Sequence, residues 1–157
     1  MGSHDQSLQE RLAPTNACFG CGPANEKGLR IRSFPEGDEL VCDWTPQKHH
    51  EAWPGVVNGG ICGALLDCHS NWAAAWHLLN ANGLEELPST VTADFHVKLR
   101  RPTPSTAPLR LRARVVESDA ARAVVQASIE SGGEVTATCR GTFVAVPPGH
   151  PAHHRWR

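Results

Sequence analysis

The 157-residue sequence predicts a single α+β domain, in which one long central helix is wrapped by a curved antiparallel sheet of about six strands. The segment from about Gly59 to Asn82 contains no proline, is rich in Ala and Leu, and is apolar nearly all round, which is typical of a buried helix. Runs with alternating apolar and polar residues lie on both sides of it. The sheet must curl around such a helix if it is to bury it.

Two short strands are predicted before the helix and four longer ones after it. The first two span residues 29–34 and 39–45, and a loop follows at 46–55. The alternation in the later runs favours antiparallel strands with one covered face, and short turns connect the last three. These later strands are predicted at 90–100, 109–118, 122–131 and 134–146.

We expect the folded domain to span residues 16–146. Residues 1–15 are predicted to be a mobile or helical lead-in, in which Gly2–His4 resemble a cloning remnant. The Pro/His-rich tail at 147–157 is predicted to be extended.

Composition limits the partners of the domain. The net charge of −1 argues against bulk binding of nucleic acid. Asp67 interrupts the longest apolar stretch, so no membrane association is predicted. The polar N-terminal residues show no secretory signal, and the six cysteines are therefore predicted to be reduced thiols in a cytoplasmic protein.

The start of the central helix carries the first candidate site residues. Asn58 can cap the helix, and Gly59 and Gly60 open it. Free N–H groups at a helix start favour a developing negative charge, such as the oxyanion of a thioester. The alternative interpretation is a turn beside a tight packing contact.

Asp67 is an acid in the middle of this apolar helix. It lies eight residues after Gly59, about 12 Å along the axis, so one small carbonyl cannot touch both groups in one chain. If both serve one reaction, the acid comes from a second copy through antiparallel pairing of the helices. Ser70 and Asn71 share the face of Asp67 and either orient its carboxylate or line a pocket. The alternative is a buried structural Asp satisfied by these neighbours.

Four stretches of the sequence resemble the hotdog-fold acyl-CoA thioesterases of the phenylacetate-pathway type. They are similar to a Cys-Phe-Gly-Cys-Gly opening, to a Pro-Gly-(hydrophobic)₂-His-Gly-Gly helix start followed by an Asp, to a strand that ends in a basic residue and Pro, and to the strands that follow. The helix start is the specific motif, because Gly, Gly and Asp keep both type and spacing. The matching stretches are 16–31, 54–68, 92–104 and the strands to about 146.

The resemblance implies roles for individual residues. Asp67 corresponds to the catalytic acid, which acts as a general base on water or as a nucleophile. Gly59 or Gly60 corresponds to the backbone donor to the thioester oxygen, with Gly59 favoured. Thr92 corresponds to a hydroxyl that helps to hold the attacking water, and Asn58 stands where relatives have His. Similar proteins are dimers or dimers of dimers with active sites between subunits.

The resemblance also places coenzyme A. Lys98, Arg100 and Arg101 lie where the family binds its phosphate-bearing end, and the guanidinium group suits phosphate. A plain charged surface is the alternative. No separate cofactor is predicted, because coenzyme A enters as part of the substrate.

Cys18 and Cys21 form a C-x-x-C pair. A zinc site usually shows a second paired set of ligands with defined spacing, and none is evident, so no metal is predicted. We expect this segment to pack near the mouth of the pocket. The other candidate ligands are His49, His50, Cys68 and His69.

The sequence thus predicts hydrolysis of an acyl-CoA thioester between subunits, with two alternatives. One is a catalytically weak protein that binds acyl-CoA or a small ligand, suggested by Asn58 and by Ala52, which stands where some relatives place an Asn. The other is a hotdog hydratase or dehydratase, which pairs an acid with a His. His69 lies about 200° around the helix from Asp67, so His96 would have to serve.

Overall fold

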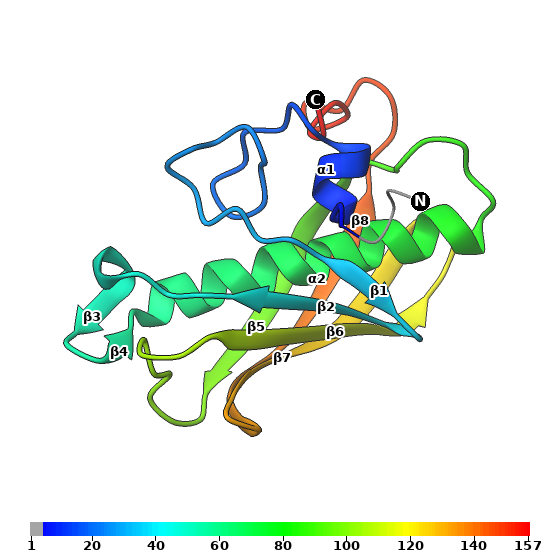
Figure 1. Cartoon of the computed structure of the whole chain (residues 1–157). Coiled ribbons are helices and arrows are strands. Elements are labelled where there is room, and N and C mark those ends of the chain that lie inside the picture. The colour runs from blue at the N-terminus through cyan, green and yellow to red at the C-terminus, as the bar shows by residue number, and fades with distance from the viewer. Residues whose placement is uncertain (1–4) are drawn as a thin grey trace.

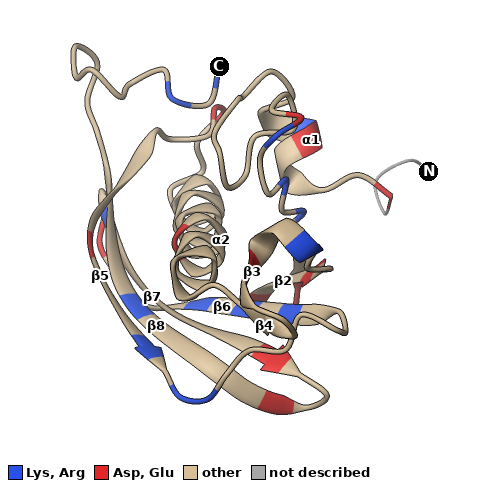
Figure 2. Ribbon diagram, turned by 90° about the vertical axis from the view of Figure 1, so that its left-hand side faces the viewer, with Lys and Arg blue, Asp and Glu red and all other residues tan. Residues whose placement is uncertain are grey.

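One long helix, α2 (Gly59–Ala81), lies along the concave face of a six-stranded antiparallel sheet in the computed structural model, which describes residues 5–157 (Figures 1 and 2). The strand order is β1-β2-β6-β7-β8-β5, which leaves β1 and β5 at the edges. The predicted architecture is confirmed. The strands are β1 (Phe34–Glu36), β2 (Glu39–Trp44), β5 (Thr90–Leu99), β6 (Leu109–Ser118), β7 (Arg122–Ser131) and β8 (Glu134–Ala145).

Helix α2 begins where the sequence predicts. The side-chain oxygen of Asn58 accepts hydrogen bonds from the backbone N–H groups of Gly60 (2.8 Å) and Ile61 (3.2 Å), which is the usual N-cap geometry. The helix ends at Ala81, within one residue of the prediction. Its apolar side chains pack against β6, β7 and β8 in the main core. No helix in residues 5–157 is long and apolar enough to cross a membrane.

The first predicted strand is wrong for most of its length, because β1 begins only at Phe34. The preceding residues belong to the N-terminal loop, which we define as residues 16–33, and they pair with an earlier part of the same loop. The backbone N–H of Leu29 donates to the Phe19 carbonyl (2.7 Å), and that of Ile31 donates to the Gly20 carbonyl (3.2 Å). Leu29 and Ile31 are buried, so their alternation reflects packing of the loop rather than a place in the sheet.

The predicted loop at 46–55 also contains regular structure. A short 3₁₀ helix, η1 (Lys48–His50), leads into β3 (Glu51–Trp53). Strand β3 pairs with β4 (Val56–Val57) in a separate two-stranded sheet just before α2. These elements were too short to give a periodic signal in the sequence.

Both ends of the described chain fold back onto the domain. Within the predicted lead-in, residues Leu8–Leu12 form α1, and a capping box between Ser7 and Glu10 fixes its start. The C-terminal tail, residues 147–157, forms consecutive turns rather than the predicted extended segment. Trp156 is buried against Trp72, with ring centroids 4.6 Å apart.

The N-terminal loop, α1 and the tail lie on the side of α2 away from β6 and β7 (Figures 1 and 2). The indole N–H of Trp156 donates to the Pro88 carbonyl (2.8 Å), which fixes the tail near the start of β5. The helix is therefore apolar nearly all round because the sheet covers one side and these terminal segments cover much of the other.

Candidate active site

Asp67 lies in the third turn of α2 and is half-buried against β5. The hydroxyl of Thr92 donates a 2.7 Å hydrogen bond to Asp67 Oδ1. Burial raises the pKa of the Asp67 carboxyl, while the Thr92 hydrogen bond and the nearby charge of Arg155 oppose this rise. The side chain is thus held by one oxygen, and no other side-chain hydrogen bond reaches it from the described residues.

A second contact joins α2 to β5 one turn further along the helix. The Thr90 hydroxyl donates to Asn71 Oδ1, and the Asn71 amide donates to the Thr90 carbonyl at 3.3 Å. Ser70 is fully buried, and its hydroxyl has no partner in the described part of the chain. Neither Ser70 nor Asn71 hydrogen-bonds the Asp67 carboxylate in the described residues, and Thr92 is the side chain that orients it. Their contact with substrate stays a prediction.

The two glycines at the start of α2 differ in their backbone N–H groups. That of Gly60 is bound by the Asn58 side chain, whereas that of Gly59 has no partner among residues 5–157. A Cβ atom at Gly59 would lie 3.0 Å from Leu99 Cδ1, so β5 also approaches closely here. Of the two predicted donors, Gly59 is therefore the one whose N–H is available. The tight packing contact that was the alternative interpretation of the glycines also occurs at Gly59.

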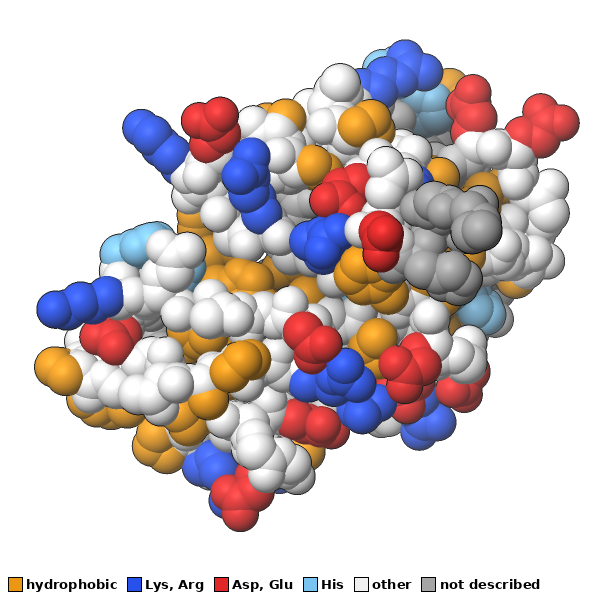
Figure 3. All heavy atoms as spheres, viewed as in Figure 1, with side chains coloured by type: hydrophobic (Ala, Val, Ile, Leu, Met, Phe, Trp, Pro, Cys, Tyr) orange, Lys and Arg blue, Asp and Glu red, His pale blue; other side chains and the backbone are white. Residues whose placement is uncertain are grey.

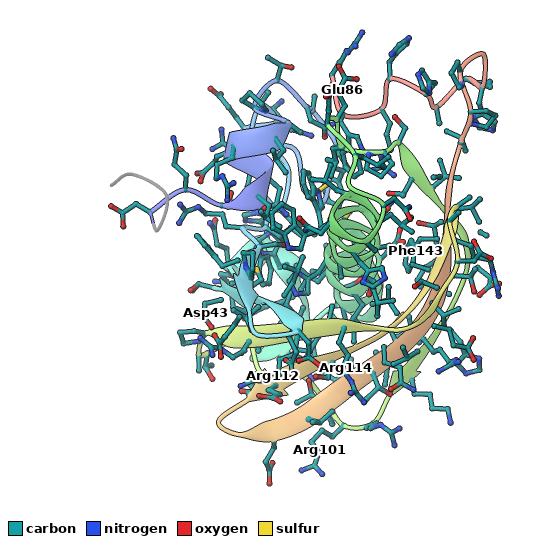
Figure 4. All side chains as sticks on the ribbon, turned by 90° about the vertical axis from the view of Figure 1, so that its right-hand side faces the viewer. Asp43, Glu86, Arg101, Arg112, Arg114 and Phe143 are labelled. Atoms are coloured by element: carbon teal, nitrogen blue, oxygen red, sulfur yellow. The ribbon has the colours of Figure 1, made fainter. Side chains whose placement is uncertain are left out.

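Strand β5 runs beside α2 and meets both ends of the motif. A bulge at Ala93 shifts its register, so Thr92 pairs with Phe143 and Leu99 with Ala137, both buried strand residues that face the helix. Figure 4 shows Phe143 between α2 and the sheet. Gly59 and Asp67 therefore lie along one edge of the molecule, where β5 is the outermost strand.

The basic residues predicted to bind coenzyme A lie apart from Asp67. Lys98 pairs with Thr138 and lines a surface hollow on the sheet face away from α2, together with Arg100. Arg101 forms a 2.8 Å ion pair with Glu134 and projects beyond that face in Figure 4. The structure does not bring these residues and Asp67 to the same face within one chain.

The two histidines considered for hydratase chemistry, His69 and His96, do not lie beside Asp67. His69 is fully buried, and its ring nitrogens bond the Ser33 hydroxyl (2.8 Å) and the Leu40 carbonyl (2.9 Å). His96 lines the hollow on the opposite face of the sheet. Neither forms a pair with Asp67 within the chain.

Arg155 is a site residue that the sequence analysis missed. One of its guanidinium nitrogens, Nη1, donates to the Thr90 carbonyl (2.7 Å), and its charge acts on the Asp67 carboxyl. The guanidinium also lies 4.2 Å from the centre of the Trp156 ring. No local pattern signals this role, because the contact requires the tail to fold back over the helix.

Comparison with solved structures identifies the fold. No protein-family model matches the sequence, and no curated protein matches it either. A thioesterase superfamily protein from Shewanella loihica is 26% identical with a TM-score of 0.63, covering 80% of this chain and 98% of its own. A phenylacetic acid degradation-related protein from Ralstonia eutropha is 23% identical with a TM-score of 0.62, covering 74% and 86%.

A thioesterase from Haemophilus influenzae is 20% identical with a TM-score of 0.64, covering 80% of this chain and 84% of its own. All three alignments span most of both chains, so the likeness concerns the whole domain rather than a shared motif. The chain has the hotdog fold of solved thioesterase superfamily proteins, and the resemblance predicted from its sequence is confirmed.

Proposed function

We propose that this protein is a thioesterase that hydrolyses an acyl-CoA to a carboxylic acid and free coenzyme A. The observation that carries the proposal is the placement of Asp67, held by Thr92, and the unpaired N–H of Gly59 along the same outer strand. One group is a base or nucleophile and the other is an oxyanion donor, which together are what thioester hydrolysis requires. The solved thioesterase structures of the same fold support this reading.

The proposed reaction takes place between two subunits. The Gly59 N–H of one subunit polarises the thioester carbonyl, and Asp67 of the partner subunit takes a proton from water as the water oxygen attacks the carbonyl carbon. Collapse of the tetrahedral intermediate breaks the C–S bond, and the departing thiolate takes up the proton. In the alternative route, the Asp67 carboxylate attacks directly, and water then hydrolyses the resulting anhydride.

Exposed apolar groups support a homodimer built at this edge. Phe95 and Leu99 of β5 are 43% and 58% exposed, and Trp53 of β3 is 59% exposed. Figure 3 shows apolar side chains on the surface near β3, β4 and the start of α2. An unpaired edge strand beside such groups favours pairing with a second copy. A dimer of dimers is equally compatible with this contact.

A binding protein without turnover is the second candidate. Asn58, at the position of a His in related proteins, uses its side chain to cap α2. Ala52, at the position of an Asn, offers no polar group. Both differences from related proteins remove polar groups near the proposed carbonyl. Such a site binds acyl-CoA without hydrolysing it.

One assay separates these functions. The protein is mixed with short, long and aromatic acyl-CoAs, and free thiol release, ligand binding by calorimetry and enoyl-CoA hydration are followed in parallel. The proposal predicts release of one thiol for each acyl-CoA consumed, without hydration. Binding without thiol release would support the second candidate, and hydration would contradict both.

A further inference from the structure

Three cysteine sulfurs converge where the N-terminal loop crosses α2. Cys18 and Cys21 come from the loop, and Cys68 comes from the helix next to Asp67. Their sulfur atoms all lie within 4.8 Å of one another, and Cys18 Sγ is 3.8 Å from Cys68 Sγ. All three thiols are free. We call these residues the cysteine cluster.

The spacing of the sulfurs fits a tetrahedral metal. With zinc–sulfur bonds of about 2.3 Å, two thiolates on one tetrahedral Zn²⁺ lie about 3.8 Å apart. The Cys18–Cys68 distance of 3.8 Å equals this edge, and it is far longer than a disulfide bond of about 2 Å. The sequence shows no second pair of ligands, but the fold brings Cys68, one of the other candidate ligands and fifty residues away, beside Cys18.

The loop is wound tightly around the cluster. A Cβ atom at Gly20 would lie 2.3 Å from the Cys68 sulfur, and one at Gly22 would lie 2.4 Å from the Cys18 nitrogen. The backbone N–H groups of Gly20 and Cys21 also lie close to the Cys18 sulfur. Glycines that admit close approach and backbone amides beside the sulfur together form a cradle for a thiolate-bound cation.

A buried polar group also points to this cluster. Trp72 is fully buried, and its indole N–H has no regular hydrogen-bond partner among the described residues. The side chain lies close enough to interact with the Cys21 sulfur. A neutral thiol is a weak acceptor for such a donor, whereas a metal-bound thiolate is a good one.

We propose that the cysteine cluster binds a Zn²⁺ ion through the thiolates of Cys18, Cys21 and Cys68, with the fourth position left to water. Cys18 and Cys68 are only half-buried, so solvent can reach the ion. The ion ties the N-terminal loop to α2. The Asn16 side chain extends this link, because it accepts from the Cys18 N–H (2.9 Å) and donates to the Arg155 carbonyl in the tail.

The first test uses the unmodified protein, purified under reducing conditions and supplied with Zn²⁺. Elemental analysis is expected to give one zinc per chain, and the melting temperature is expected to rise with added Zn²⁺ and fall with a chelator. Removal of zinc is expected to make Cys18 and Cys68 react faster with an alkylating reagent. Absence of stoichiometric zinc, or a Cys18–Cys21 disulfide found by mass spectrometry in protein purified in this way, would overturn the proposal.

The second test assigns the ligands. Cys18→Ser, Cys21→Ser and Cys68→Ser are each expected to lose the zinc, whereas Cys62→Ser, which changes a buried cysteine on the same helix, is expected to keep it. Co²⁺ replaces Zn²⁺ as a spectroscopic probe, and thiolate-to-cobalt absorption is expected in the unmodified protein and in Cys62→Ser only. Equal zinc content in all four variants would show that the metal binds elsewhere. This inference does not rest on the proposed thioesterase activity.

Discussion

The hydroxyl of Thr92 on β5 donates a 2.7 Å hydrogen bond to the carboxylate of Asp67 on α2. This contact joins the central helix to the outermost strand and leaves the second carboxylate oxygen free of side-chain hydrogen bonds within the described residues. A carboxylate fixed in this way, at an edge that a second subunit can cover, is placed to act on a substrate that enters between subunits.

Replacing Thr92 tests whether its hydroxyl is needed for catalysis. Thr92→Val keeps the shape and removes the donor, and a hydrogen bond to a charged group contributes about 1.5–3 kcal/mol. We therefore expect kcat to fall by roughly tenfold or more. Thr92→Ser is the matched control and should retain most of the activity. Equal kcat values for the Val and Ser variants would show that the hydroxyl has no catalytic role.

A mixing experiment tests the site between subunits. Gly59→Pro removes the N–H at the first helical position, where proline is well tolerated, and Asp67→Asn removes the acid. Each variant alone should be inactive. A hybrid dimer keeps one site with both original groups, so an equal mixture should recover about one quarter of the original activity if subunits exchange freely. Failure to recover activity, once exchange is verified, would argue against sites shared by two subunits.

The predicted coenzyme contacts can be tested with two substrates. Arg100→Ala or Arg101→Ala should raise KM for acyl-CoA more than it lowers kcat, since the phosphates lie far from the bond that breaks. The same variants should treat acyl-pantetheine, which lacks the nucleotide, like the unmodified protein. Arg122→Ala, at an exposed position on β7, is the control. An equal effect on both substrates would assign these arginines to the structure of the sheet.

The tail is expected to contribute to stability. Trp156 is buried on Trp72 and bonds the Pro88 carbonyl, so Trp156→Ala should lower the free energy of unfolding by about 3–5 kcal/mol, the range for large aromatic truncations. Denaturation in urea measures this change. His154→Ala, at the neighbouring exposed position, should have little effect. If both variants unfold at the same urea concentration as the original protein, the tail does not stabilise the domain.

The fold was predictable to the extent that it depends on local pattern. Helix α2 has a continuous apolar sequence with a recognisable cap at Asn58, and the long strands alternate clearly. Gly59 and Asp67 lie on one continuous helix, as predicted, and a helix converts sequence separation directly into distance along its axis.

The contacts that were missed join residues far apart in the sequence. Cys68 meets Cys18 across fifty residues, and Arg155 reaches Thr90 across sixty-five. Neither pair has a periodic signal, since each depends on a terminal segment folding over α2. The same cause explains why the first predicted strand was wrong. Leu29 and Ile31 alternate with polar residues because they are buried by packing of the N-terminal loop, not because they lie in the sheet.

The most direct test of the account is to measure the melting temperature and kcat on one preparation of Asp67→Asn, with Asp94→Asn as the control at an exposed position on β5. Burial of the Asp67 carboxylate has a desolvation cost, so its removal should leave the melting temperature unchanged or raised. Loss of a general base should lower kcat by a factor on the order of 10² or more, while Asp94→Asn stays active. A destabilised Asp67→Asn variant with unchanged kcat would contradict the catalytic role of Asp67.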